Sequence, residues 1–346
     1  MPCWIEIINQ FIVWKNAMKK LKRRLEWVDY AKGIGIFLMV FGHTLRGLIS
    51  SSILEKSYFV EFVNTYIYAF HMPLFFFLSG LFFKSSYITN FLTFCQKKAK
   101  TFIYPYFLWS LIQISLKIAV SSSVNRQSSW KELLEIVYDP VDQFWLIYTL
   151  FLVSVFFYIA SSLGLSKSQL LIISVLLYAA HVFGISFGPW GALYLFRRHA
   201  IYFAIAAAIE PQRITLYINK FNILNKICFA IFLFGTLLLV TLLNLGVYVW
   251  AVPLIAMIGI IGTITIALVL ESKGWAYFIK NWGKLTLQIY LAHTIVSALF
   301  RVILQAVGIN DPLIHLTLGT IVGIYVPILI HNYSQKNNIK YIFAIP

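Results

Sequence analysis

The chain alternates long apolar stretches with short polar connections from one end to the other. Ten stretches have about 17 to 25 residues, which is the length that an α-helix needs to cross a bilayer. They lie near residues 31–50, 62–83, 101–120, 143–160, 168–187, 191–209, 226–244, 247–270, 284–307 and 313–332. The pattern therefore predicts an all-α integral membrane protein with about ten transmembrane helices.

Composition supports this class, because 60% of the 346 residues are apolar and only 12% are charged. A soluble domain needs about twice that share of charges to cover its surface, whereas lipid solvates apolar surface directly. We expect a basic N-terminal segment over residues 1–24, one membrane domain over residues 25–332, and a C-terminal tail over residues 333–346.

The charges fall unevenly on the two sides of the predicted membrane. A net charge of +16 would suggest nucleic-acid binding in a soluble protein. Here 19 of the 28 Lys and Arg residues lie in connections on one side and only 4 on the other. Positive charge concentrates on the cytoplasmic side of membrane proteins. The distribution thus predicts that both termini are cytoplasmic, and it predicts no nucleic-acid partner.

Ionisable side chains inside a bilayer are costly and usually mark a site or a pathway. The first predicted span carries four of them, which all fall within an arc of about 100° on a helical wheel. They are Asp29, Lys32, His43 and Arg46. Lys32 lies about 16 Å along the axis from His43. We therefore predict a polar face that leads from the cytoplasmic end to His43, although Lys32 could instead extend to the lipid headgroups.

Three other spans carry further candidates. The second has His71 just before Pro73, which should kink the helix. The sixth has Arg197 and Arg198, and the ninth has His293. His71 and His293 could equally be neutral histidines that hydrogen-bond another helix.

Together these groups outline a polar cavity within the bilayer. An imidazole, whose ordinary pKa is about 6.5, can take a proton from a hydroxyl group at neutral pH. His43 is therefore the candidate catalytic base, and the cations around it suit an anionic donor. The sequence lacks a P-loop, a dinucleotide-binding glycine motif, a serine-hydrolase elbow and a zinc-binding H-E-x-x-H. We accordingly expect no metal site.

Several segments match a known pattern in order and spacing. They are residues 24–43 (RLEWVDYAKGIGIFLMVFGH), 70–83 (FHMPLFFFLSGLFF), 105–107 (PYF), 144–146 (FWL), 197–198 (RR) and 283–293 (GKLTLQIYLAH). With them the chain resembles the membrane acyltransferase 3 family, and in particular its fucose 4-O-acetylase-like branch. The resemblance covers roughly residues 24 to 330.

The resemblance implies a ten-helix protein of the bacterial inner membrane. Such proteins move an acetyl or other acyl group from cytoplasmic acyl-CoA to a sugar hydroxyl of a surface polysaccharide or its lipid-linked precursor. His43 matches the family's first-span histidine. Lys32 stands where many relatives have arginine, which keeps the charge but loses bidentate binding of phosphate. Acyl-CoA is then a donor substrate, and no permanently bound cofactor is expected.

We therefore predict a membrane O-acyltransferase, most simply an O-acetyltransferase. His43 would act as the base or carry the acyl group itself, and Asp29, Lys32, Arg46, His71, Arg197, Arg198 and His293 would bind donor or acceptor. The alternative is a carrier or flippase for a lipid-linked sugar or polysaccharide, because embedded charges suit that function equally well.

Overall fold

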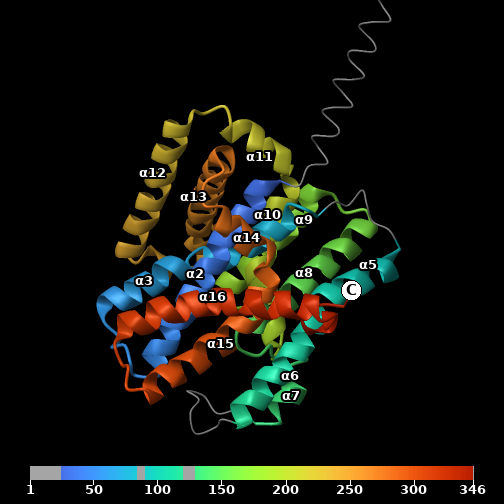
Figure 1. The fold of residues 1–346 in the computed structure, drawn as a ribbon. Coiled ribbons are helices and arrows are strands. Elements are labelled where there is room, and N and C mark those ends of the chain that lie inside the picture. Colours follow the sequence, from blue (N-terminus) through green and yellow to red (C-terminus); the bar gives the residue numbers. More distant parts are fainter. Residues whose placement is uncertain (1–24, 84–89, 120–128, 346) are drawn as a thin grey trace, which may run out of the picture.

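The computed structural model describes residues 25–83, 90–119 and 129–345, and every regular element in them is helical. The first half contains α2 (Glu26–Ser50), α3 (Tyr58–Tyr68), α4 (His71–Gly80), α5 (Phe91–Lys98), η2 (Ala99–Ile103), α6 (Tyr104–Ala119), α7 (Glu132–Glu135), η4 (Asp142–Phe144) and α8 (Trp145–Ser162). The second half contains α9 (Lys167–Val182), α10 (Gly191–Ala208), α11 (Pro211–Ile218), α12 (Ile223–Leu242), η5 (Leu245–Val247), η6 (Val249–Ala251), α13 (Val252–Lys273), α14 (Tyr277–Lys284), α15 (Thr286–Ala306), α16 (Pro312–Lys336) and η7 (Lys340–Ile342). Figure 1 shows their arrangement.

Within the described residues, eight helical segments are long and apolar enough to cross a membrane. A ninth candidate is the pair α10 and α11, which bends by 71° at the break between them. The helix α9 is apolar but shorter, with 16 residues. The prediction of an all-α integral membrane protein is thus confirmed. The count of ten spans and the cytoplasmic position of both termini stay predictions.

The structure describes most of the predicted C-terminal tail but not the predicted N-terminal segment. Residues 1–24, the expected basic segment, lie outside the described residues. The predicted tail begins within α16, which continues to Lys336. Beyond it, Phe343 is buried and stacks on Trp109 of α6, whose indole N–H donates to the carbonyl of Ile342 at 2.8 Å. Ile342 and Phe343 are therefore packed against the bundle.

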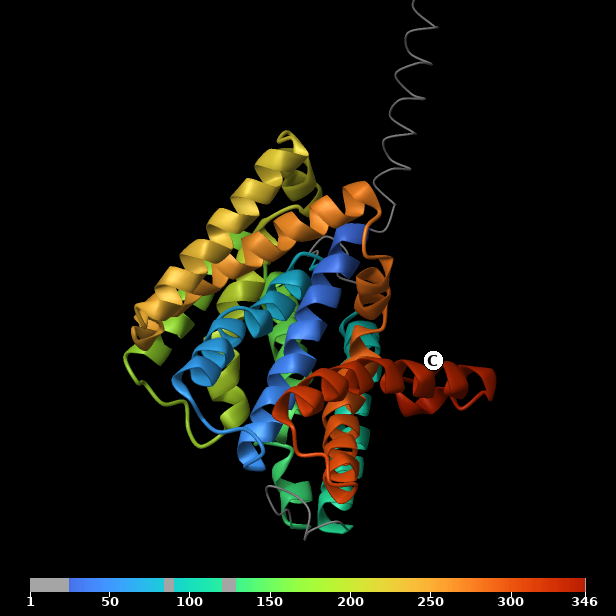
Figure 2. The same cartoon turned by 60° about the vertical axis from the view of Figure 1, so that its left-hand side comes forward.

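Helix α2 lies in the middle of the bundle and contacts α4, α13, α14, α15 and α16, as Figure 2 shows from the side. Helix α14 packs so closely against the first turns of α2 that the two backbones are in contact. Gly33 faces the carbonyl oxygen of Ile279, and Gly283 faces that of Asp29, so neither glycine has room for a Cβ. Close packing of this kind is usual where small residues meet in membrane helices.

An ion pair fixes the same contact at the beginning of α2. The Lys280 ammonium lies 2.6 Å from the Glu26 carboxylate. This hydrogen bond to Glu26 raises the pKa of Lys280. Helix α14 is thereby held against α2 by backbone packing and by charge.

The second span is interrupted where proline predicted a kink. Helix α3 ends at Tyr68 and α4 begins at His71. Pro73 has no N–H to offer the carbonyl four residues earlier, so the regular bonding pattern fails here. The His71 ring bonds the backbone of the preceding turn at this break, since its Nδ1 lies 2.8 Å from the carbonyl oxygen of Ile67. The expected kink therefore places an imidazole at the break.

Candidate active site

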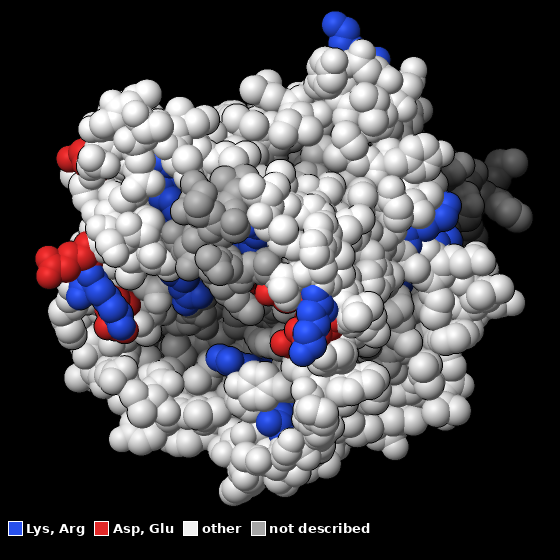
Figure 3. All heavy atoms as spheres, turned by 90° about the horizontal axis from the view of Figure 1, so that it is seen from below, with Lys and Arg blue, Asp and Glu red and all other residues white. Residues whose placement is uncertain are grey.

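A cavity of about 1040 Å³ lies inside the bundle. Its wall includes Ser50 and Lys117 near the ends of α2 and α6, and Asp142 and Asn244 in the connections before α8 and after α12. It is therefore close to the end of the bundle where α2 and α6 finish. Figure 3 looks at this end, where the surface is hollowed and Lys and Arg side chains lie around the hollow. The predicted topology makes this the extracytoplasmic end.

His43 lines this cavity and stands in a row of aromatic rings. Its ring centroid lies 5.2 Å from that of His293 and 6.2 Å from that of Tyr68. Tyr68 in turn lies 4.5 Å from His71. The structure thus brings together three histidines that come from α2, α4 and α15. His71 and His293 are fully buried and stand behind the side chains that line the cavity.

Hydrogen bonds to backbone carbonyls indicate which ring nitrogen carries the proton in His71 and His293. Nδ1 of His293 lies 2.8 Å from the carbonyl oxygen of Tyr290, and Nδ1 of His71 bonds the carbonyl of Ile67. A carbonyl oxygen only accepts, so Nδ1 carries the proton in both rings. In each neutral ring Nε2 is then an acceptor. This nitrogen has no partner among the described residues in either ring, nor does Nε2 of His43.

Arg46 lies one turn beyond His43 on α2 and is also part of the cavity wall. Its guanidinium carbon is 3.3 Å from the centroid of the Tyr68 ring, and its Nε donates to Asn64 at 2.7 Å. Gly42 makes this arrangement possible, because a Cβ there would lie 2.9 Å from the edge of the Tyr68 ring. Glycine at this position therefore lets the Tyr68 ring approach α2 beside His43.

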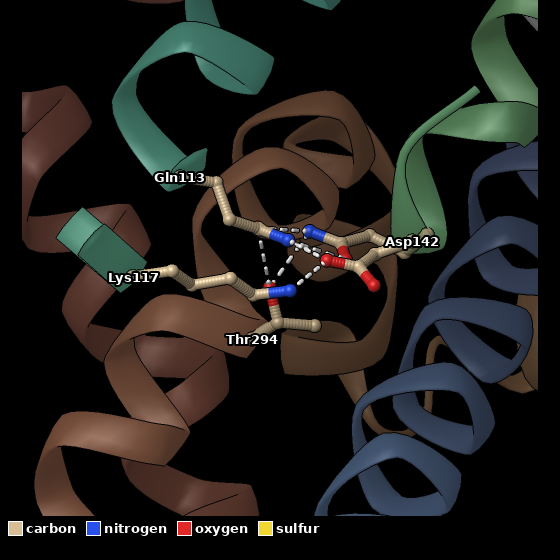
Figure 4. A network of polar contacts seen from close by, with 5 residues as sticks. Gln113, Lys117, Asp142 and Thr294 are labelled. Carbon is tan, nitrogen blue, oxygen red and sulfur yellow. Dashed lines mark hydrogen bonds and ion pairs between the residues drawn. The ribbon is translucent and has the colours of Figure 1, made fainter. Parts of the chain in front are cut away.

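A polar network forms another part of the wall (Figure 4). Lys117 and Asp142 form an ion pair, and Gln113 donates to Asp142 at 2.6 Å. Gln143 donates to Gln113 at 2.8 Å and to Thr294 at 2.7 Å. These bonds connect α6, η4 and α15. Thr294 directly follows His293, so the network holds the part of α15 that carries this histidine.

The structure distributes the predicted site residues over two regions. His43, Arg46 and Arg198 line the cavity. Asp29 and Lys32 do not line it; α14 packs over their part of α2, and both have interaction partners of their own. The polar face predicted for α2 is therefore divided, and the cavity includes only its second half.

The adjacent arginines of α10 point in different directions. Arg198 contributes to the cavity, whereas Arg197 is buried outside it, with its guanidinium carbon 5.4 Å and 5.3 Å from the ring centroids of Phe187 and Tyr194. The next residue, His199, packs against Phe76 and Trp145 and is also part of the cavity wall.

Several wall residues were not singled out from the sequence. They are Gln113, Lys117, Asp142, Gln143 and Thr294. Gln113 and Lys117 are four residues apart in an apolar helix, and this spacing could have marked them as a polar face. Within the described residues, no three His, Cys, Asp or Glu side chains come together as a group that could hold a metal ion.

Among the described residues, the cavity therefore combines the unpartnered Nε2 of His43 with several cations inside an apolar bundle. A family model described as an acyltransferase domain matches residues 25–332 of this chain. The chain belongs to the acyltransferase 3 family. It is a multi-pass membrane acyltransferase. No curated protein and no solved structure gives a significant match.

Proposed function

We propose that this acyltransferase moves an acyl group, most simply acetyl, from acyl-CoA to a sugar hydroxyl of a bacterial surface polysaccharide or its lipid-linked precursor. Its location would be the bacterial inner membrane, and it would belong to the fucose 4-O-acetylase-like branch of the family. The observation that carries the proposal is the position of His43 in the wall of a cavity large enough for a sugar.

The chemistry requires one proton transfer in each direction. His43 would take the proton of the sugar hydroxyl while the hydroxyl oxygen attacks the thioester carbonyl carbon. The tetrahedral intermediate then collapses, the carbon–sulfur bond breaks, and the imidazolium returns the proton to the leaving thiolate. The products are a sugar ester and free coenzyme A. In a two-step variant the His43 nitrogen carries the acyl group before the hydroxyl attacks.

The cations and the two rear histidines have supporting functions in this proposal. The Arg46 guanidinium, one turn from His43, is placed to stabilise the oxyanion that forms on the thioester carbonyl. His293 stands 5.2 Å from His43 between ring centroids, and its Nε2 accepts hydrogen bonds. It could therefore orient the His43 ring or a hydroxyl of the acceptor. The His71 ring packs against the Tyr68 ring, and the Arg46 guanidinium stacks over that same tyrosine ring.

Donor and acceptor would enter from opposite sides. The acceptor reaches His43 through the cavity at the end where α2 finishes. The donor comes from the cytoplasm, where Lys32 is the candidate contact for a coenzyme A phosphate. Lys32 is half-buried and about 16 Å along α2 from His43, a distance that the acyl-bearing arm of the donor must span.

The test is mass spectrometry of the surface glycan from cells with and without the gene. We expect loss of ester groups from a polymer that is still exported in normal amount. Loss of the polymer itself would support the carrier or flippase instead. That alternative must carry a whole glycan past the part of α2 that α14 covers, whereas the acyltransferase needs a passage there only for the acyl-bearing arm of the donor.

A further inference from the structure

The wall of the His43 cavity is strongly cationic. Of the described residues that line it, four carry a positive charge and one carries a negative charge. The cations are Arg46, Lys117, Arg198 and Arg301, and the anion is Asp142. A neutral sugar needs hydrogen-bonding groups but no such excess of charge. The imbalance therefore requires an explanation of its own.

The single carboxylate does not balance the arginines, because it is already occupied. Asp142 pairs with Lys117 and accepts a further hydrogen bond from Gln113 (Figure 4). No other Asp or Glu among the described residues is part of the cavity wall. Asp142 therefore does not offset the charges of Arg46 and Arg198, for which no ion pair with another described residue is formed.

Neutral groups hold Arg46 and Arg301 in place. Nε of Arg46 donates to the amide oxygen of Asn64, and Nη1 of Arg301 donates to the carbonyl of Gly47 at 2.8 Å. Arg46 extends from α2 and is held by Asn64 of α3, whereas Arg301 extends from α15 and is held by the α2 backbone at Gly47, the residue next to Arg46. Arg301 is only 9% exposed. Arg46 is exposed and Arg198 is half-buried, so water reaches both, but like charges lining one cavity repel each other and an anion bound among them relieves this repulsion.

We infer that the acceptor carries an anionic group, a phosphate or a carboxylate, which binds among Arg46, Arg198 and Arg301 while a nearby hydroxyl lies at His43. Guanidinium groups bind both kinds of anion through paired hydrogen bonds. Arg46 is three residues from His43, or about 4.5 Å along the axis. The anion and the reacting hydroxyl would thus belong to the same sugar or to adjoining ones. This inference rests on the proposed function.

Coenzyme A is also anionic, so the side of the membrane on which the cavity opens decides whether donor or acceptor meets the arginines. In the predicted topology the cavity opens at the extracytoplasmic end, away from the cytoplasmic pool of acyl-CoA. Arg198 is two turns into α10 from that end, and its guanidinium makes no hydrogen bond or ion pair with other described residues. The acceptor rather than the donor should therefore contact it.

Binding of small probes to the purified full-length chain tests the inference. The probes are pyrophosphate, methyl glucuronoside, neutral methyl glucoside and coenzyme A, and binding is measured by titration calorimetry in detergent. We expect pyrophosphate or the glucuronoside to bind at least about tenfold more tightly than the glucoside. Arg198→Gln should weaken that binding at least about tenfold, as expected for one lost charge-assisted hydrogen bond.

Arg213→Gln is the matched control, because Arg213 lies on α11, outside the cavity, and pairs with Glu210. Arg301→Gln is a second test should Arg198→Gln fold poorly. Preference for pyrophosphate indicates a lipid-linked phosphate, and preference for the glucuronoside indicates an acidic sugar. Equal binding of the neutral glucoside, or an effect of Arg198→Gln on coenzyme A alone, overturns the inference. Ester loss in His43→Gln cells tests the proposed function separately.

Discussion

Replacement of His43 by glutamine is the most informative single change. Glutamine keeps a polar side chain that can hydrogen-bond, but it cannot take up a proton as a base. General base catalysis supplies about 10²- to 10⁴-fold in rate, which corresponds to roughly 2.7 to 5.5 kcal/mol of transition-state stabilisation. We therefore expect at least a hundredfold loss of acyl transfer.

Stability should change far less than activity. His43 is half-buried, and its Nε2 has no hydrogen-bond partner among the described residues. The substitution then breaks no hydrogen bond of that nitrogen, and we expect a cost in folding within about 1 kcal/mol. The variant should accumulate in the membrane at close to the normal level.

The assay is ester content of the glycan by mass spectrometry, with protein level measured by immunoblot in the same cells. His43→Ala should lose as much activity as His43→Gln. His331→Gln is the matched control, since His331 is on α16 outside the cavity. Near-normal activity of His43→Gln would refute the reasoning, and the base would then have to be His71 or His293.

Three further predictions use other parts of the structure. If Lys32 binds the donor, Lys32→Ala should raise the KM for acyl-CoA while Lys32→Arg restores it; unchanged kinetics of the alanine variant would mean that Lys32 only extends to the headgroups. A reporter fused after Lys340 should read cytoplasmic and one inserted near Asn125 extracytoplasmic; the same side for both would contradict the predicted topology. Gly42→Ala should lower acyl transfer at normal abundance, because its methyl group must displace the Tyr68 ring; in a Tyr68→Leu background the same change should have no added effect, and equal losses in both backgrounds would exclude this mechanism.

Much of the fold followed from the sequence, because membrane spans are specified locally by length and apolarity. The break in the second span could be predicted for the same reason, since Pro73 acts on its own helix. His43 and Arg46 were found on one face of α2 by helical spacing alone, and the structure keeps them together in one cavity.

Features that depend on contacts between distant helices could not be predicted in this way. Helical spacing put Asp29 and Lys32 on the same face as His43, but α14 packs over that part of α2 and separates them from the cavity. The network of Gln113, Gln143 and Thr294 joins positions up to 181 residues apart, so no local pattern indicates it.

The central claim is that this protein esterifies a glycan in a reaction that depends on His43. Its most direct test reconstitutes the purified protein in liposomes with isotopically labelled acetyl-CoA outside and glycan extracted from the deletion strain inside. The orientation of the protein is determined by protease protection. The account predicts labelled ester on the glycan with the wild type and none above background with His43→Gln. Glycan that crosses the membrane without gaining label, or equal labelling by both proteins, would contradict it.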